Sequence, residues 1–182
     1  IKIFDKEVTT LTDDQLNDIR VRIGFMFQNG ALYDSMSVRQ NLTFTLKHHT
    51  RNLSEEVIET KIIEALESVG LKEAIDKMPS ELSGGMKKRI ALARAIIVMP
   101  EIIFYDEPTS GLDTITSREI SELIVSVQKK YNTSSIIITH DVDCARMISN
   151  RMILLIDRIN YAEGTFETLL SSKDPKVQAF FK

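Results

Sequence analysis

The chain has 182 residues, 43% of them hydrophobic and 27% charged, and a formal net charge of −3. This composition is ordinary for a globular protein with a core of its own, and it gives no electrostatic reason to expect nucleic-acid binding. The single cysteine, Cys144, excludes an internal disulfide framework and favours a reducing compartment. The longest apolar run, residues 90–99, is too short to cross a bilayer.

The first residues alternate between strand and helix signals. Residues 2–4 are expected to end a strand, and Thr12 with Gln15 forms a capping box that opens a short helix. The apolar stretch 22–28 is the next predicted strand and ends at Gln28.

From Ser37 onward the pattern is helical as far as Glu81. Ser37 with Gln40 gives a second capping box, and Ser54 is expected to cap a long helix that ends at Gly70. The apolar residues of that long helix are expected to share one face: Val57, Ile58, Ile62, Ala65, Leu66 and Val69.

The remainder of the chain begins with a helix that opens at Ser83 and ends before Pro100. Strands and helices then alternate: strand 102–106, helix 114–131, strand 135–139, helix 141–150 and strand 152–156. Near-continuous apolar strands joined by helices predict a buried, mostly parallel sheet. The fold class is therefore α/β, with the helical block as an insertion.

Two patterns in this second half suggest phosphate chemistry. Ser83, Gly84 and Gly85 open a helix, where bare backbone N–H groups can face an anion, and the two glycines suggest close approach of another surface. Residues 87–89 add positive charge to the first turn, but we assign none of them as a ligand, because a solvated basic face explains them equally well.

The second pattern is the acidic pair Asp106 and Glu107 at the end of an apolar strand. Such a pair suits a magnesium ion and an attacking water, although it could also simply end the strand and cap a turn. Adjacent strand residues point to opposite faces, so the two acids are expected to do different jobs. His140 ends the following strand, where a satisfied polar residue is the alternative interpretation.

These motifs, in the order Gln28, residues 82–86, residues 102–113 and His140, closely resemble the ATPase subunit of ABC transporters, and the resemblance covers essentially the whole chain. It implies a RecA-like P-loop NTPase core with an inserted helical subdomain. Residues 1–28 would be part of the core, 29–82 the helical subdomain, and 83–182 the rest of the core with carboxyl-terminal helices.

The resemblance also implies roles at an ATP site. Asp106 would order Mg²⁺ through water, Glu107 would polarise the attacking water, and His140 would contact the γ-phosphate and help to hold that water. Gln28 would touch both the metal and the water when ATP is bound. ATP and Mg²⁺ are the cofactors that follow.

In the family, the motif matched by Ser83, Gly84 and Gly85 closes over the γ-phosphate held by the opposing subunit, so the resemblance implies a head-to-tail dimer of ATPase subunits. Asp113 matches the residue that communicates across that dimer. Asp113 is also a credible helix N-cap, and the two roles are compatible.

One family motif is absent. The nucleotide-binding loop G-x-x-x-x-G-K-[ST] needs two glycines five apart and a lysine, and no pair of the seven glycines fits. We expect the chain as given to be inactive alone, with the loop and the adenine-stacking residue upstream of Ile1.

The segment that begins at Gly30 and ends at Val38 is implied to receive a helix of an integral membrane permease. Leu32, Tyr33 and Met36 are expected to be exposed there, the alternative being that they pack under the insertion. No nucleic-acid partner is expected.

Within the family, the chain looks like the branch that serves MCE-associated lipid transport, including outer-membrane lipid-asymmetry systems. The features that match are the permease-facing segment, Met86 and the tail 174–181, while Thr114 departs from the proline often found there. This branch implies phospholipid transport between bacterial membranes, a possible MCE-domain partner, and a place on the cytoplasmic face of the inner membrane. An ATPase of a small-solute importer and a non-catalytic interaction module stay open as alternatives.

Overall fold

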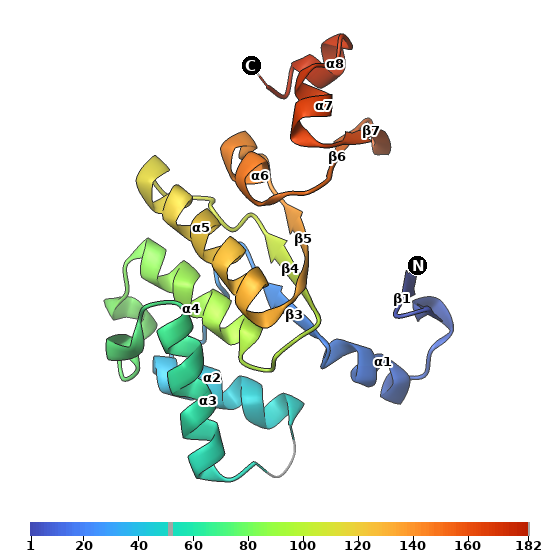
Figure 1. The fold of residues 1–182 in the computed structure, drawn as a ribbon. Helices are drawn as coiled ribbons and strands as arrows, with labels where there is room; N and C mark the ends of the chain where they lie inside the picture. The colour runs from blue at the N-terminus through green and yellow to red at the C-terminus, as the bar shows by residue number, and fades with distance from the viewer. Residues whose placement is uncertain (51–52, 182) are drawn as a thin grey trace.

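Three parallel strands form the centre of the computed structural model, which describes residues 1–50 and 53–181 (Figure 1). They are β3 (Ile23–Met26), β4 (Ile102–Asp106) and β5 (Ser134–Ile138), with β4 in the middle. In the register of the sheet, Phe25 lies opposite Phe104, and Phe104 lies opposite Ile136. The predicted parallel sheet is confirmed for these three strands.

Helices α4 (Gly84–Ile96) and α5 (Thr114–Tyr131) lie along one side of these strands (Figure 1). The approach of α4 to β3 explains a glycine within a strand. A Cβ atom added at Gly24 would lie 2.5 Å from the carbonyl oxygen of Ala95, a separation that no side chain tolerates.

The helical block contains α2 (Val38–His49) and α3 (Glu55–Ser68), followed by short 3₁₀ turns at Lys72–Ala74 and Pro79–Glu81. The Ser37 capping box, the Ser54 cap and the stop at Gly70, whose φ is +67°, are all as predicted. Val57 is an exception to the predicted apolar face: it is exposed, whereas Ile58 in the same turn is buried, because successive residues lie about 100° apart around a helix.

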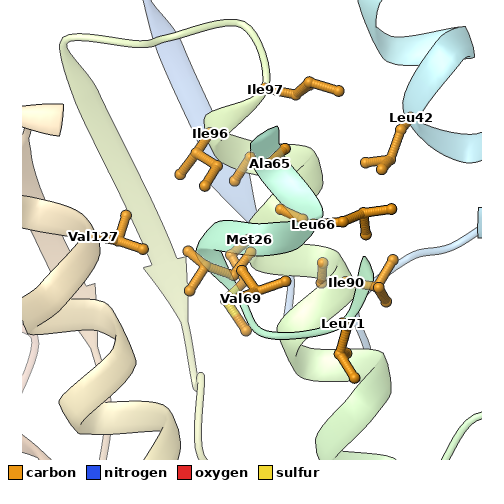
Figure 2. Packing of buried hydrophobic residues seen from close by; sticks show 14 of the residues in the cluster. Met26, Leu42, Ala65, Leu66, Val69, Leu71, Ile90, Ile96, Ile97 and Val127 are labelled. Atoms are coloured by element: carbon orange, nitrogen blue, oxygen red, sulfur yellow. The ribbon is translucent and has the colours of Figure 1, made fainter. Parts of the chain in front are cut away.

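A single core joins the helical block to the sheet. Met26 of β3 belongs to one buried cluster with Leu42 of α2, Leu66 of α3, Ile90 of α4 and Val127 of α5, all labelled in Figure 2. The hydrophobic residues of the insertion and of the α/β part therefore stabilise each other. The division at residues 28 and 82 stays a prediction.

The carboxyl-terminal part contains α6 (Val142–Ile148), β6 (Met152–Ile156), β7 (Ile159–Gly164), α7 (Phe166–Leu170) and α8 (Pro175–Gln178). The predicted strand at 152–156 is present, but it pairs antiparallel with β7 and not with β5. The reason is local: Asp157 and Arg158 have φ values of +53° and +67°, and two successive left-handed residues turn the chain back into a hairpin.

The amino-terminal part lies across the strands from α4 and α5 (Figure 1). It consists of a hairpin of β1 (Lys2–Ile3) and β2 (Lys6–Glu7), a 3₁₀ turn at Val8–Thr10, and α1 (Asp13–Arg20). The capping box of Thr12 with Gln15 is confirmed. Among the described helices, none combines the length and the apolar character that crossing a bilayer requires.

Candidate functional site

The carboxyl ends of β4 and β5 bring two of the predicted site residues into contact. Glu107 Oε1 lies 2.8 Å from His140 Nδ1, and Glu107 Oε2 accepts a hydrogen bond of 3.3 Å from Thr139 Oγ1. The carboxylate is mostly buried, at 18% exposure, while the imidazole is 81% exposed. The hydrogen bond to the Glu107 carboxylate raises the pKa of His140.

The backbone of Glu107 is left-handed, with a φ of +47°. Such a conformation costs a non-glycine residue about 1–3 kcal/mol and persists where the surroundings hold it. Here the Glu107 N–H donates to Ile138 O at 2.9 Å, and the Glu107 carbonyl accepts from Lys88 Nζ at 3.0 Å. Strand β4 ends at Asp106, so strand alternation does not separate the two acids as predicted; this backbone turn does.

Asp106 is the last residue of β4, and alternation places it on the same face of the sheet as Phe104. Its carboxylate accepts no hydrogen bond from the described residues, so both oxygens remain available. Mg²⁺ prefers oxygen ligands and keeps several waters, so a site with one carboxylate suits it. The described part of the chain holds no cluster of three or more His, Cys, Asp or Glu side chains fit for a metal. The role of Asp106 at a metal stays a prediction.

Gln28 lies in the exposed turn that follows β3. Its side chain makes no hydrogen bond with the described residues, but its carbonyl oxygen accepts one of 2.5 Å from Lys88 Nζ. The structure therefore links Gln28 to Glu107 through a shared donor. The predicted contact of Gln28 with the metal and the water stays a prediction.

Lys88 is the functional candidate that the sequence analysis missed, because none of residues 87–89 was assigned a role. Lys88 is only 6% exposed, and Arg89 is half-buried, donating 3.2 Å to Val69 O and 2.9 Å to Glu119 Oε2. Burial lowers the pKa of Lys88. Helical spacing could have revealed this, since Lys88 shares a face with the buried Ala91 and Leu92.

The glycine pair at the start of α4 serves packing within the chain. A Cβ atom at Gly85 would lie 2.8 Å from Thr116 Cγ2, at the start of α5, and one at Gly84 would lie 3.5 Å from Leu112 Cδ2. The close approach predicted for this pair thus exists, at Gly85, inside one subunit. Ser83 is the N-cap, with its hydroxyl accepting 3.2 Å from the Met86 N–H. Anion binding there stays a prediction.

The Asp113 carboxylate caps α5, as predicted. Its Oδ1 accepts 3.0 Å hydrogen bonds from the N–H groups of Ile115 and Thr116, and its Oδ2 accepts 2.6 Å from Thr116 Oγ1. The side-chain bond from Thr116 is the main cause that lowers the pKa of Asp113. The role of Asp113 across a dimer stays a prediction.

A cavity of about 840 Å³ opens between α5 and α6. Ser117 and Arg118 of α5 line one side, Cys144 and Arg146 of α6 line the other, and His140 lies at its edge. Neither Asp106 nor Glu107 lines this cavity, so it lies beside the acidic pair and does not enclose it.

Asn41 of α2, which is fully buried, shapes the segment predicted to meet a permease. Its Nδ2 donates to the carbonyls of Tyr33, Met36 and Ser37 at 3.0–3.2 Å, and its Oδ1 accepts 2.8 Å from the Tyr33 N–H. Tyr33 is 46% exposed and meets the ring of Phe44 edge-on at 5.0 Å.

The predicted exposure of this segment is confirmed for Tyr33 alone. Leu32 packs against the main core, Met36 is half-buried, and Val38 at the far end is fully buried. Asn41 ties the loop to α2, and of the three large apolar side chains predicted to be exposed only that of Tyr33 faces solvent.

Comparison with known proteins agrees with this geometry. The family model described as ABC transporter matches residues 1–110. The intermembrane phospholipid transport system ATP-binding protein MlaF of Haemophilus influenzae is 40% identical over 181 residues, covering 99% of the chain and 68% of that protein. The Mycobacterium leprae protein named "Probable ribonucleotide transport ATP-binding protein mkl" is 37% identical over 180 residues, and the chain spans 52% of its length.

Solved structures show the same fold. The dimeric post-hydrolysis ATP-binding cassette MJ0796 bound to ADP and Pi superposes with a TM-score of 0.79 at 31% identity, covering 90% of this chain and 72% of that one. The RecA-like α/β fold expected from the sequence is thereby confirmed. The chain belongs to the ABC transporter family, as an ATP-binding subunit.

Proposed function

We propose that the protein hydrolyses ATP in the presence of Mg²⁺ and thereby drives phospholipid transport between bacterial membranes. The observation that carries the catalytic part is the 2.8 Å contact of Glu107 Oε1 with His140 Nδ1 where β4 and β5 end. The lipid part is supported by the 40% identity to a protein named for intermembrane phospholipid transport.

Glu107 is the general base of this proposal. One carboxylate oxygen is oriented by His140 and the other by Thr139, so the group is held in place to polarise a water and accept its proton. The raised pKa of His140 favours its protonated form, which suits a neighbouring phosphate anion. Bound through Asp106, with Gln28 near by, Mg²⁺ would neutralise phosphate charge during the transfer.

We further propose that the 182-residue chain alone neither binds ATP tightly nor hydrolyses it. The phosphate-binding loop and its lysine supply most phosphate contacts in this class of site, and none of the seven glycines fits that loop. Calorimetric titration of the chain with Mg-ATP tests this statement. Micromolar affinity would show that the described residues suffice for binding.

The catalytic assignment is tested in the complete product of the gene. Glu107→Gln keeps the size of the side chain but removes the base, so turnover should fall by about 10²- to 10⁴-fold while nucleotide binding persists. Glu101→Gln is the matched control, because Glu101 is an exposed acid at the other end of the same strand and pairs with Arg22. If Glu107→Gln turns over ATP at the rate of the control, the assignment is wrong.

The proposed active form is a head-to-tail dimer in which Ser83, Gly84 and Gly85 face the nucleotide of the partner, with Asp113 at the same interface. A bound nucleotide that is not hydrolysed should hold that dimer together. Gel filtration of Glu107→Gln with Mg-ATP should therefore show a dimer that disperses when ATP is removed. A monomer under both conditions would contradict the proposed arrangement.

We propose that ATP hydrolysis is coupled to transport through an integral membrane permease that docks on the segment from Gly30 to Val38. The protein would lie at the cytoplasmic face of the inner membrane, with an MCE-domain protein in the same system. Tyr33→Ala should weaken co-purification with the permease, because Tyr33 is the exposed apolar side chain of that segment. Val57→Ala, a similarly exposed apolar residue on α3, is the control. Full assembly by the Tyr33 variant would move the docking site elsewhere.

A small-solute transporter is the second candidate, and the mycobacterial relative named for ribonucleotide transport favours it. The reconstituted system decides between the two: the lipid proposal expects phospholipid transfer between vesicles and no uptake of nucleotides. A complete gene product without ATPase activity would instead support the third alternative, a non-catalytic interaction module.

A further inference from the structure

Lys88 is a charged residue in an unusual position. Among the described residues whose side chains are buried, Asn41, Thr109 and Ser121 are neutral, while Lys88 carries a formal charge. A lysine ammonium is expensive to bury unless its hydrogen-bond donors are matched. The acceptors that its ammonium group contacts therefore indicate its role.

The ammonium has three donors and meets three acceptors from two separate segments. Lys88 Nζ donates 2.5 Å to the carbonyl of Gln28, 3.0 Å to the carbonyl of Glu107 and 3.3 Å to Ser110 Oγ. Two of these acceptors are backbone atoms, so the contacts fix the backbone on both sides. The turn after β3 and the loop after β4 are thus joined through a single side-chain atom.

At Glu107 the contact acts on strained backbone. The φ of +47° turns the carboxylate toward His140, and the peptide groups on its two sides are hydrogen-bonded to Ile138 O and to Lys88 Nζ. If the Lys88 contact is removed, one of the two constraints on this conformation is lost. The residue can then relax toward ordinary strand geometry, which turns its side chain away from His140.

The turn after β3 is held by the same helix at a second point. Arg94, further along α4, donates 3.0 Å through Nη2 to the carbonyl of Gly30 and also binds the carbonyl of Ala31 through Nη1. Gly30 and Ala31 have φ values of +74° and +45°. Arg94 thus holds the turn without reaching the acid, whereas Lys88 contacts both.

We propose that Lys88 is a positioning residue that holds the Glu107 backbone in its catalytic conformation and ties it to the turn at Gln28, so that displacement of the turn is transmitted to the catalytic base. This inference rests on the proposed function, in which Glu107 is the base. Lys88 lies in α4, the helix whose amino-terminal end carries Ser83, Gly84 and Gly85.

The first readout is steady-state kinetics of the complete gene product. Lys88→Met keeps most of the side-chain volume and removes the three donors. It should lower kcat by about tenfold to a hundredfold, the size expected for a displaced catalytic group, while the KM for Mg-ATP changes less than about twofold. Lys129→Met is the matched control, since Lys129 is an exposed lysine of α5.

The second readout is the pKa of His140, followed by the NMR shift of its ring protons. In the native protein the hydrogen bond that His140 makes to the Glu107 carboxylate raises this pKa. If Lys88 positions Glu107, Lys88→Met lets the carboxylate leave, and the pKa of His140 falls. If Lys88 acts only as a nearby positive charge, its removal leaves that pKa unchanged or raises it further. Only the positioning role predicts a fall in the pKa of His140.

A kcat within about twofold of the control, or a His140 pKa that stays raised in Lys88→Met, overturns the inference. Should Lys88→Met not fold, Ser110→Ala removes a single acceptor and should produce a smaller fall in kcat, about two- to tenfold, with the same direction of pKa change. If Glu107→Gln hydrolyses ATP normally, the proposed function fails, and the His140 titration still decides whether Lys88 positions Glu107.

Discussion

The two faces of the central sheet carry apolar side chains of similar size in opposite environments. On the face toward α4 and α5, Met26, Ile103 and Tyr105 are essentially inaccessible to solvent. On the other face, Phe25 and Ile136 are exposed, and Phe104 lies between them in the register of the sheet. Neighbouring residues of one strand therefore differ completely in burial.

The covered face of the sheet stabilises the fold, and the open face carries a residue of the candidate site. The covered face contributes the core that the sheet shares with the helical block. The open face carries Asp106, which follows Phe104 by alternation and lies opposite Ile138. A parallel sheet is normally covered on both faces. The uncovered apolar face beside Asp106 is therefore the unusual one among the described residues.

The largest effect expected from this comparison is on the free energy of unfolding. Ile103→Ala removes buried methyl groups from a fully enclosed site and should cost about 2–5 kcal/mol. Ile136→Ala, a neighbour in the sheet that is 51% exposed, should cost less than about 1 kcal/mol. Urea unfolding followed by circular dichroism measures both. Equal costs would mean that the open face is packed in solution.

A smaller effect is expected where α4 approaches β3. Gly24→Ala places a methyl group 2.5 Å from the Ala95 carbonyl oxygen, and the backbone must shift to accept it. Overpacking of this kind costs about 1–3 kcal/mol. Ser134→Ala, at an exposed position of β5, is the control. An unchanged unfolding midpoint for Gly24→Ala would show that α4 can move away from the sheet at no cost.

Substitutions on the open face should change the binding of an apolar dye more than they change the free energy of unfolding. The ring of Phe25 lies 4.3 Å from that of Phe27 in a tilted arrangement and stacks on Phe104 at 6.0 Å, which makes a continuous aromatic surface. We expect the chain to bind the apolar dye ANS and expect Phe25→Ser to reduce its fluorescence, with little change in the unfolding midpoint. A variant that unfolds at markedly lower urea would contradict the exposed placement of this ring.

Sequence patterns predicted most elements because the signals are local. The capping residues Thr12, Ser37, Ser54 and Asp113 each accept backbone hydrogen bonds in their own first turn, so spacing within four residues is enough to find them. The motif order was sufficient to place the acidic pair and His140 at the ends of adjacent strands.

What the sequence did not predict depends on tertiary contacts. An apolar run such as residues 136–138 specifies a strand but not which of its faces is covered. The left-handed backbone of Glu107 and the buried ammonium of Lys88 meet in a hydrogen bond that spans 19 positions of sequence. Similarly, Val57 was placed on the apolar face of α3 by its spacing, but it is exposed while Ile58 beside it is buried.

The smallest effect concerns the pH dependence of stability, because His140 lies at the exposed edge of the sheet, outside both faces. Its folded-state pKa is raised above the unfolded value of about 6.5 by the hydrogen bond that it makes to the Glu107 carboxylate. The stabilisation is therefore fully present below a pH of about 6.5 and is lost as pH rises through the raised pKa. His49 acts in the opposite direction, since burial lowers its pKa.

Subtracting the pH profile of Glu107→Gln from that of the native chain isolates the His140 contribution, because His49 is unchanged in both. Urea unfolding between pH 5.5 and 9 should give a small difference that declines with rising pH, because solvent screens an exposed ion pair. A difference that grows with pH would mean that Glu107 and His140 are not paired in solution.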